Sequence, residues 1–166
     1  MDFNENLAEG MTNLTTTGAF LTSKSAKGTN AMTISWGFIG VVWGKPHFIT
    51  LVRPQRYTKK IIDEGNSFTV SIPWNNAMKE ELAICGTKSG RDIDKGAIVK
   101  FLPSKMVEAP IVDGCQTYLE CRINYADVLE GVRIPELIRS VMYDGDFHTF
   151  YFGEIVASYS ASQKQA

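Results

Sequence analysis

The chain has 166 residues, 44% of them apolar, which is enough for one domain with a sizeable core that needs no disulfides. Its 17 basic and 18 acidic side chains give a net charge of -1, and this near balance argues against binding nucleic acid or an anionic membrane through an overall field. The first twenty residues show no basic segment followed by an apolar run, and no apolar run of about 18 residues occurs anywhere. We therefore expect neither export nor membrane insertion.

The first half of the chain alternates β-rich stretches with turn residues. Glycine and proline at Gly28, Gly44 and Pro46 separate the first three stretches and predict a meander. A helical pattern follows over 57–65 and ends at Gly65, as a C-cap would end it. The strands predicted in this half are 17–23, 32–43, 47–52 and 68–72.

The second half adds two helices and three strands. Asn75 is the predicted N-cap of a helix that runs to about Cys85, where Gly86 ends it. Residues 133–143 are a second predicted helix, with Pro135 in its first turn. The strands predicted here are 98–107, 116–129 and 147–158.

Many strands with few helices, and no alternation of strand and helix, predict a mainly β fold closed into a barrel rather than a parallel sheet. No GxGxxG motif opens a helix, so a Rossmann site for a dinucleotide is not expected. The three cysteines, Cys85, Cys115 and Cys121, have no CxxC spacing, so we expect reduced thiols, a cytoplasmic location and no metal site.

The stretch GTNAMTISWG, residues 28–37, is an unusual strand. Asn30, Thr33 and Ser35 place hydrogen-bonding groups beside the indole of Trp36, and glycines flank the run. Such an edge is open to approach by another backbone or by a ligand.

A second candidate is the segment RPQRYT, where a strand gives way to a helix. Arg53, Arg56 and Thr58 can converge there with free helical N–H groups, and Thr58 can act as a cap. This is an anion site in outline, suited to a phosphate monoester, although a solvated helix start explains the same residues equally well.

A third candidate is the loop CGTKSGRDIDKG, where Ser89, Gly90, Arg91 and Asp92 could turn several N–H groups inward. The loop taken alone is better explained as an exposed charged turn after a helix.

The two histidines are the last candidates. His47 reads as a loop residue without metal partners, and a lone histidine such as His148 on a strand is more often structural than catalytic.

Together these segments resemble the FMN-binding split-barrel proteins of the flavin reductase and flavoredoxin group. The resemblance runs from about Gly18 to Ser158 and rests on GTNAMTISWG, LVRPQRYTKKIIDEGNSFTVSIP, CGTKSGRDIDK and GDFHTFYFGEIVA, in that order. It implies that 1–166 is a single flavin reductase-like FMN-binding domain with a six-stranded Greek-key barrel. It also implies a homodimer, with FMN close to the subunit interface.

The resemblance also implies roles for individual residues. The strand segment would line the flavin ring and ribityl chain, RPQRYT would bind the phosphate with help from Lys60, the loop would close over the flavin, and His148 would be catalytic on the nicotinamide side. The residues implied to bind FMN are Asn30, Met32, Thr33, Ser35, Trp36, Arg53, Arg56, Thr58, Thr87, Ser89, Gly90 and Arg91, with Asp92 in the same loop.

The sequence departs from the family pattern in two places. Phe147 stands between Asp146 and His148, where close relatives have Gly-Asp-His. The segment 130–145 is longer than the usual turn before the last strand, and it could cover the site or add to a dimer interface.

The implied function is an oxidoreductase that passes hydride from NAD(P)H to FMN and electrons onward, without nucleic acid or membrane partners. An alternative is a flavoredoxin-type carrier that keeps FMN bound and exchanges electrons with an acceptor protein, without using NAD(P)H directly. A third alternative is a barrel that binds no flavin. The sequence does not distinguish NADH from NADPH.

Overall fold

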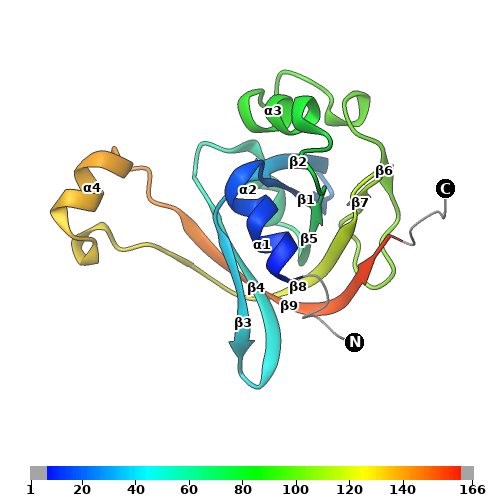
Figure 1. Ribbon diagram of the computed structural model, residues 1–166. Coiled ribbons are helices and arrows are strands. Elements are labelled where there is room, and N and C mark those ends of the chain that lie inside the picture. The colour runs from blue at the N-terminus through cyan, green and yellow to red at the C-terminus, as the bar shows by residue number, and fades with distance from the viewer. Residues whose placement is uncertain (1–6, 162–166) are drawn as a thin grey trace.

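The structure is a computed structural model that describes residues 7–161, and it consists mainly of β-strands. Short helices lie at the ends and edges of the strands (Figure 1). The strands are β1 (Ala19–Ser25), β2 (Gly28–Ile34), β3 (Gly37–Val42), β4 (Lys45–Val52), β5 (Ser67–Ile72), β6 (Phe101–Leu102), β7 (Ile111–Val112), β8 (Thr117–Val128) and β9 (Thr149–Ser160). The helices are α1 (Leu7–Thr16), α2 (Tyr57–Ile62), α3 (Lys79–Thr87) and α4 (Glu136–Met142), with 3-10 turns η1 (Lys95–Ala97) and η2 (Gly131–Arg133).

Seven strands form one antiparallel sheet in the order β2-β1-β5-β8-β9-β4-β3, and β6 and β7 form a separate pair. The edge strands β2 and β3 are consecutive in the chain and only Ser35 and Trp36 separate them. Because three Cα–Cα steps span at most about 11 Å, the sheet must curl until its two edges are close. This confirms the mainly β split-barrel class.

The predicted strand 32–43 is therefore two strands, which is why the sheet has seven strands and not the expected six. β2 pairs with β1 and β3 pairs with β4, so the chain changes from one edge of the sheet to the other at Ser35 and Trp36. These two residues lie at the split of the barrel. The turn between β3 and β4 has positive φ at Trp43 and Gly44 (51° and 71°), as a tight hairpin needs.

Two clusters of buried side chains fill the fold. The larger lies inside the barrel, where Phe48 and Phe68 meet edge to face with ring centroids 6.4 Å apart. The smaller lies under α3 and includes Phe20, Leu82 and Tyr118. Burying one such side chain contributes roughly 1.5–3 kcal/mol, so these clusters hold the strands that frame the site.

Several predicted elements are wrong in extent. In 98–107 only Phe101–Leu102 is a strand, because Pro103 and Ser104 end the pairing. Asn75 does not cap α3, which begins four residues later after left-handed residues at Asn75, Asn76 and Met78.

Three other predictions need correction. Pro135 precedes α4 as its N-cap instead of lying in the first turn. His47 is not a loop residue: it lies in β4 and is fully buried. The helix α1 was not predicted, because its threonine-rich sequence has weak helix propensity, and it is held by the burial of Leu14 in the barrel core.

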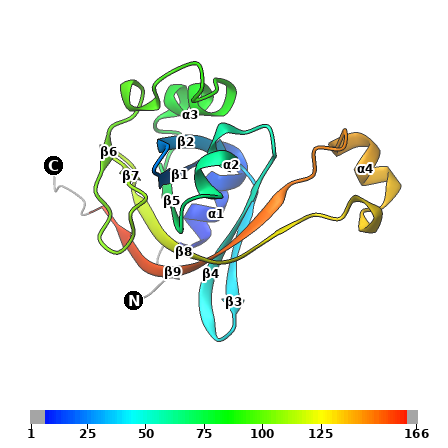
Figure 2. The same cartoon turned by 180° about the vertical axis from the view of Figure 1, so that it is seen from behind.

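The β8–β9 hairpin extends beyond the barrel. The first five residues of β8 are buried and most of the rest are exposed, and the backbone N–H of Leu129 donates to the carbonyl of His148 at 2.9 Å where the pairing ends. We call residues 129–147, which include η2 and α4, the arm. Figures 1 and 2 show it reaching away from the barrel, with α4 near its tip.

Candidate functional site

Two adjacent cavities lie at the split of the barrel. The first, of about 270 Å³, is called the histidine chamber here. Its walls come from β2, the Ser35-Trp36 crossing, the end of β4 and the start of β9. The lining residues are Met32, Thr33, Ile34, Ser35, Trp36, Leu51, Arg53, Arg56 and His148.

The second cavity, of about 190 Å³, is called the loop chamber here. It shares Met32 and Arg56 with the histidine chamber, so the two lie on either side of these side chains. Together they reach the size of small-molecule sites, about 300–1,000 Å³. The lining residues are Asn30, Ala31, Met32, Gln55, Arg56, Tyr57, Thr58, Cys85, Thr87, Lys88, Ser89 and Gly90.

The structure thus brings together eleven of the twelve predicted binding residues and His148; the exception is Arg91, which lines neither chamber. The Arg91 guanidinium lies 5.1 Å from the centre of the Tyr57 ring and donates to the Gln55 carbonyl at 3.2 Å. It therefore supports two wall residues from outside. Lys60 and Asp92 also line neither chamber.

Asn30 and Thr58 form a buried pair on the wall of the loop chamber. The Asn30 amide donates to the Thr58 hydroxyl oxygen at 2.8 Å. The expectation that Thr58 caps α2 is wrong, because Arg56 is the N-cap residue and no side chain caps the helix. The hydroxyl proton of Thr58 has no acceptor in residues 7–161, so it remains available to a bound group.

Arg56 joins the loop chamber to the end of α3. Its guanidinium donates to the Gly86 carbonyl at 2.7 Å and to the Cys85 carbonyl at 3.4 Å, which occupies only part of its five N–H groups. Burial lowers the pKa of Arg56, and it forms no ion pair within the described part of the chain. A partly buried arginine without a carboxylate partner favours an anionic ligand.

The loop after α3 is held from below by a buried lysine. Lys95 is 2% exposed, and its ammonium donates to the Lys88 carbonyl at 2.5 Å and to the Ile84 carbonyl at 3.3 Å. Gly90 packs so tightly that an added Cβ would lie 2.0 Å from Asn30 Oδ1. These contacts disfavour the alternative of a loosely exposed turn.

Arg53 differs from Arg56 although only two residues separate them. It forms an ion pair with Asp146, and its other terminal nitrogen donates to the Met142 carbonyl at 2.7 Å. Hydrogen bonds from Gln55 and then Arg53 hold the pKa of Asp146 well below its usual range. Arg53 therefore has much of its charge balanced within the protein, before any ligand is considered.

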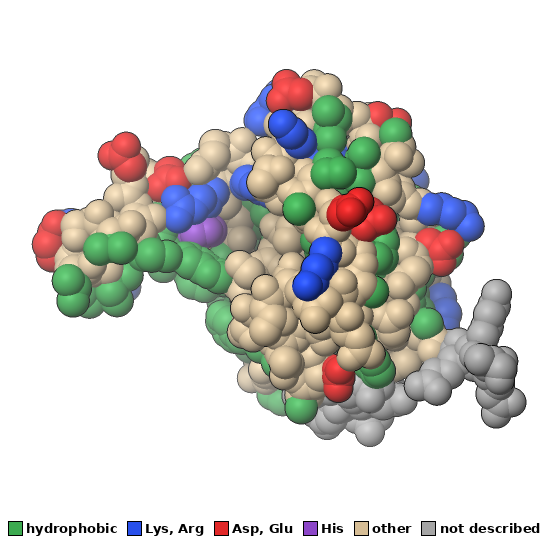
Figure 3. Space-filling model, turned by 45° about the horizontal axis from the view of Figure 1, so that its top comes forward, with side chains coloured by type: hydrophobic (Ala, Val, Ile, Leu, Met, Phe, Trp, Pro, Cys, Tyr) green, Lys and Arg blue, Asp and Glu red, His purple; other side chains and the backbone are tan. Residues whose placement is uncertain are grey.

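His148 is buried at the root of the arm and forms one wall of the histidine chamber. Its ring lies 4.9 Å from that of Trp36, and its Nδ1 lies 3.0 Å from the Tyr143 hydroxyl. Burial, and next the charge of Arg53, lower the pKa of His148 to about 4 against an opposing effect of Asp146. The ring is therefore neutral at neutral pH. Figure 3 shows histidine and basic side chains beside a hydrophobic band where the arm meets the barrel.

The combined lining carries three cations, Arg53, Arg56 and Lys88, and none of the lining residues is a carboxylate. The histidine chamber contains the Trp36 ring and apolar side chains such as Met32 and Leu51, and the loop chamber contains the hydroxyl groups of Thr58, Thr87 and Ser89. This combination suits an elongated ligand with a planar ring and an anionic tail.

Sequence reasoning missed several wall residues. Lys88 and Tyr57 stand inside the quoted segments and could have been chosen for their donors, whereas nothing in the sequence marks an apolar residue as a wall of a cavity. The lining residues that were not predicted are Ala31, Ile34, Leu51, Gln55, Tyr57, Cys85 and Lys88.

Residues 7–161 contain no group of three or more His, Cys, Asp or Glu side chains that could hold a metal. Within the same residues no helix has the length and apolar character needed to span a membrane.

Comparison with known proteins identifies the family. The profile described as "Flavin reductase like domain" matches residues 11–166. A flavoredoxin structure from Methanosarcina acetivorans is 27% identical, with a TM-score of 0.69, over 88% of this chain and 69% of that one. A Pyrococcus abyssi protein described as uncharacterized is 28% identical over 95 residues, 57% of this chain, and the match spans about half (54%) of that protein's length.

Two more distant structures share the fold. Flavoredoxin of Desulfovibrio vulgaris (Miyazaki F) is 22% identical, with a TM-score of 0.68, over 87% of this chain and 69% of that one. An NADH:FAD oxidoreductase from Streptomyces globisporus is 19% identical, with a TM-score of 0.66, over 87% of this chain and 74% of that one.

Proposed function

Because the chain belongs to the flavin reductase-like family, we propose that it is an FMN-binding oxidoreductase that takes electrons from NAD(P)H. The observation that carries the proposal is the pair of adjacent chambers with Arg56 on their shared wall. A planar ring fits the histidine chamber and a phosphate fits the loop chamber, which matches the two ends of FMN.

The residues of the chain fit the parts of FMN. In the histidine chamber, Trp36 and Met32 offer apolar surface for the ring, and Thr33 and Ser35 offer short polar groups. In the loop chamber, Arg56 and the hydroxyl groups of Thr58 and Ser89 can donate to phosphate oxygens, whereas the Thr87 hydroxyl already donates to the Ala83 carbonyl at 2.7 Å. Since Arg53 is paired with Asp146, we assign the phosphate to Arg56 rather than to Arg53.

The chemistry supplied by bound FMN is hydride transfer from NAD(P)H and onward electron transfer. The protein's part is to orient the two rings, exclude water and place donors where negative charge develops. In this proposal His148 lies on the nicotinamide side of the histidine chamber, where its neutral ring can donate a hydrogen bond without adding charge.

Anaerobic mixing of the FMN-loaded protein with NADH and, separately, NADPH tests the proposal. We expect the yellow flavin absorbance to bleach within seconds with at least one of them. Protein that binds neither FMN nor FAD in an equilibrium titration would refute the flavin assignment. FAD is the comparison ligand because one structural relative is described as an NADH:FAD oxidoreductase.

A second function, the flavoredoxin-type electron carrier, is favoured by the similarity to the flavoredoxin from Methanosarcina acetivorans. In this case the flavin binds, neither nicotinamide nucleotide bleaches it, and a reduced electron-transfer protein does. The same anaerobic experiment therefore separates the two functions. The free, buried cysteines among residues 7–161 support a cytoplasmic location as part of either proposal.

We further propose that the protein is a homodimer whose arms pack against the partner. None of the residues of α4 is buried, and Val132, Leu137 and Val141 of the arm are 75–82% exposed. A second exposed apolar patch, with Val41 and Trp43, lies on the β3–β4 hairpin. Two such patches on one chain can cover each other reciprocally about a twofold axis.

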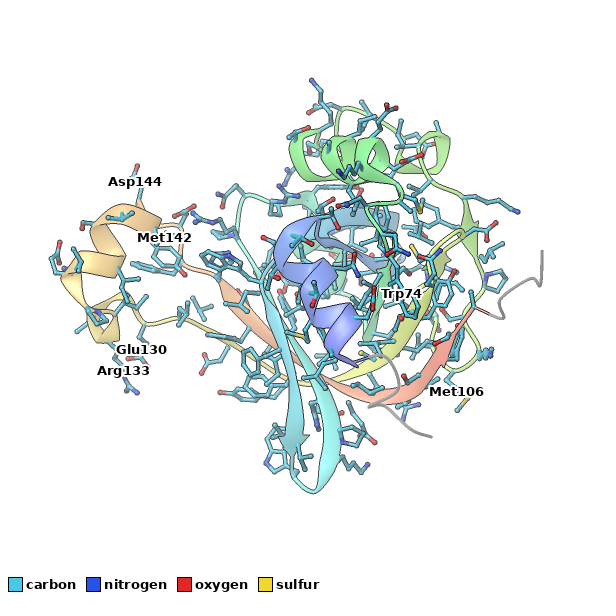
Figure 4. The ribbon with its side chains drawn as sticks, viewed as in Figure 1. Trp74, Met106, Glu130, Arg133, Met142 and Asp144 are labelled. Atoms are coloured by element: carbon cyan, nitrogen blue, oxygen red, sulfur yellow. The ribbon has the colours of Figure 1, made fainter. Side chains whose placement is uncertain are left out.

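Sedimentation velocity tests the dimer. Leu137→Asp combined with Val141→Asp should convert it to monomer at micromolar concentration. Met106→Asp is the control, because Met106 is 56% exposed and lies on the side of the molecule away from the arm (Figure 4). A wild-type protein that sediments as a monomer would contradict the arrangement. Equal effects of the double variant and of Met106→Asp would contradict it as well.

A further inference from the structure

The root of the arm is fastened to the barrel by Arg53. The guanidinium pairs with Asp146 and donates to the Met142 carbonyl at 2.7 Å, and the Gln55 amide donates to the same carboxylate at 2.8 Å. Figure 4 shows Met142 and Asp144 where the chain leaves α4 to return to the barrel. The returning chain is thus held at both its backbone and its side chains.

Tyr143 lies between this fastening and the histidine. Its ring centre is 5.2 Å from the Arg53 guanidinium carbon and 5.1 Å from the centre of the Phe147 ring. Its hydroxyl lies 3.0 Å from Nδ1 of His148. Burial raises the pKa of Tyr143, so the hydroxyl keeps its proton. That proton has no acceptor other than His148 among residues 7–161.

The other nitrogen of His148 faces a different environment. Nε2 has no hydrogen-bond partner in the described part of the chain. It is nevertheless not fully buried, because the fully buried side-chain atoms without a partner there are the Thr22 and Thr50 hydroxyls alone. The ring itself lines the histidine chamber. A neutral imidazole carries one N–H and one acceptor nitrogen, so an Nδ1 that accepts from Tyr143 requires an N–H at Nε2.

We propose that Tyr143 is a positioning residue: held by Arg53, it donates to Nδ1 of His148 and so fixes the tautomer that presents Nε2–H to the histidine chamber. The catalytic consequence, a hydrogen bond from Nε2–H to the carbonyl edge of a bound ring, rests on the proposed function. The tautomer does not, because every contact that sets it lies within the protein.

The charged and titratable groups around His148 come from three parts of the chain. Arg53 follows β4, Asp146 and Tyr143 belong to the arm, and Arg56 at the start of α2 lines the same chamber. Burial and Arg53 oppose a charged imidazolium and Asp146 favours it. The neutral tautomer is therefore the state to measure at neutral and mildly alkaline pH.

The second histidine of the chain provides an internal reference with the opposite tautomer. Nδ1 of His47 lies 3.0 Å from the Lys45 carbonyl, which can only accept, so that nitrogen carries the proton. Nε2 of His47 lies 3.4 Å from the Asn124 amide nitrogen, which can donate to it. With only two histidines, His148→Gln assigns both sets of signals.

Long-range proton–nitrogen NMR of flavin-free protein labelled with ¹⁵N-histidine tests the proposal. We expect a protonated Nε2 in His148 and a protonated Nδ1 in His47. In Tyr143→Phe the His148 shifts should move toward those of a mixture of tautomers, while His47 is unchanged. Tyr125→Phe is the control: it removes a tyrosine hydroxyl that donates to Asp127 and not to a histidine, so the shifts of both histidines should be unchanged.

Kinetics supply the second readout. In FMN-loaded Tyr143→Phe, kcat should fall about tenfold with a small change in the KM for NAD(P)H, as expected for loss of one hydrogen bond that orients a donor. A wild-type His148 protonated at Nδ1, or His148 shifts unaffected by Tyr143→Phe, would overturn the proposal. Because the NMR measurement needs no flavin, its result is independent of whether the flavin proposal fails.

Discussion

The loop chamber and the histidine chamber share Arg56 and Met32 but are built in different ways. At the loop chamber, backbone carbonyls at the end of α3 hold two cations: Gly86 accepts from Arg56 in the chamber wall, and Lys88 accepts from Lys95 beneath the loop. In the histidine chamber, Arg53 reaches a partner 93 residues away, on the arm. The first, which we propose as the anion site, is held by bonds to the backbone, and the second depends on the arm. We therefore expect ligand affinity to reside mainly in the loop chamber and reactivity in the histidine chamber.

The strongest test of this contrast is Gly90→Ala. An added Cβ would lie 2.0 Å from Asn30 Oδ1 and 2.8 Å from Tyr57 Cδ1, so the loop or these two wall side chains must shift. We expect FMN affinity to fall about a hundredfold, measured by quenching of flavin fluorescence, because the shift disturbs the loop and the Asn30–Thr58 pair together. Gly40→Ala is the control, since its Cβ would meet nothing within 4 Å. Unchanged FMN affinity in Gly90→Ala would remove the loop chamber from the site.

The next effect concerns stability and belongs to the histidine chamber. The folded-state pKa of His148 is lowered to about 4, so the unfolded chain binds a proton first as pH falls. The contribution of His148 to the free energy of unfolding is complete above its unfolded-state pKa of about 6.5 and is lost as pH falls toward its folded-state pKa. The loss between about pH 7 and pH 5 is on the order of 2 kcal/mol. Urea unfolding across this range measures it.

His148→Gln is the matched variant for that measurement. It should flatten the pH dependence of the free energy of unfolding between about pH 7 and pH 5. An equally steep dependence in the variant would mean that other groups cause it.

Arg56→Ala distinguishes the anionic end of the ligand from the ring. Loss of a charge-assisted hydrogen bond should weaken FMN binding about tenfold or more. Riboflavin, which lacks the phosphate, should be affected much less, so the ratio of the two dissociation constants is the measurement. Lys60→Ala is the control for general charge, because Lys60 lies on the same helix but lines neither chamber. Equal losses for FMN and riboflavin would refute the phosphate assignment.

The smallest effect on binding is expected for Arg53→Ala. Since Arg53 is engaged with Asp146 and the Met142 carbonyl, its removal should loosen the arm and weaken FMN and riboflavin alike, by about threefold. A loss confined to FMN, as large as that of Arg56→Ala, would return Arg53 to the phosphate site that the sequence suggested.

Much of the site could be predicted because its segments are marked locally. Glycine-flanked polar residues around Trp36, arginines before a helix and a glycine-rich loop after one are patterns within a dozen residues. Eleven of the twelve binding residues that the family resemblance implied line the two chambers. The exception, Arg91, lies in the loop whose residues Ser89 and Gly90 line the loop chamber, but its own side chain lies over the Tyr57 ring.

The sequence by itself determined the mainly β class and the segments that form the site, because alternation, turns and caps are set by residues close together in the chain. Only the tertiary structure decided that 32–43 is split across the barrel at Ser35 and Trp36 and that Arg53 forms an ion pair with Asp146. It also decided that the hydroxyl of Tyr143, on the arm, lies within hydrogen-bond distance of Nδ1 of His148. These contacts join residues far apart in the sequence, so no local pattern marks them, and only the path of the folded chain brings them together.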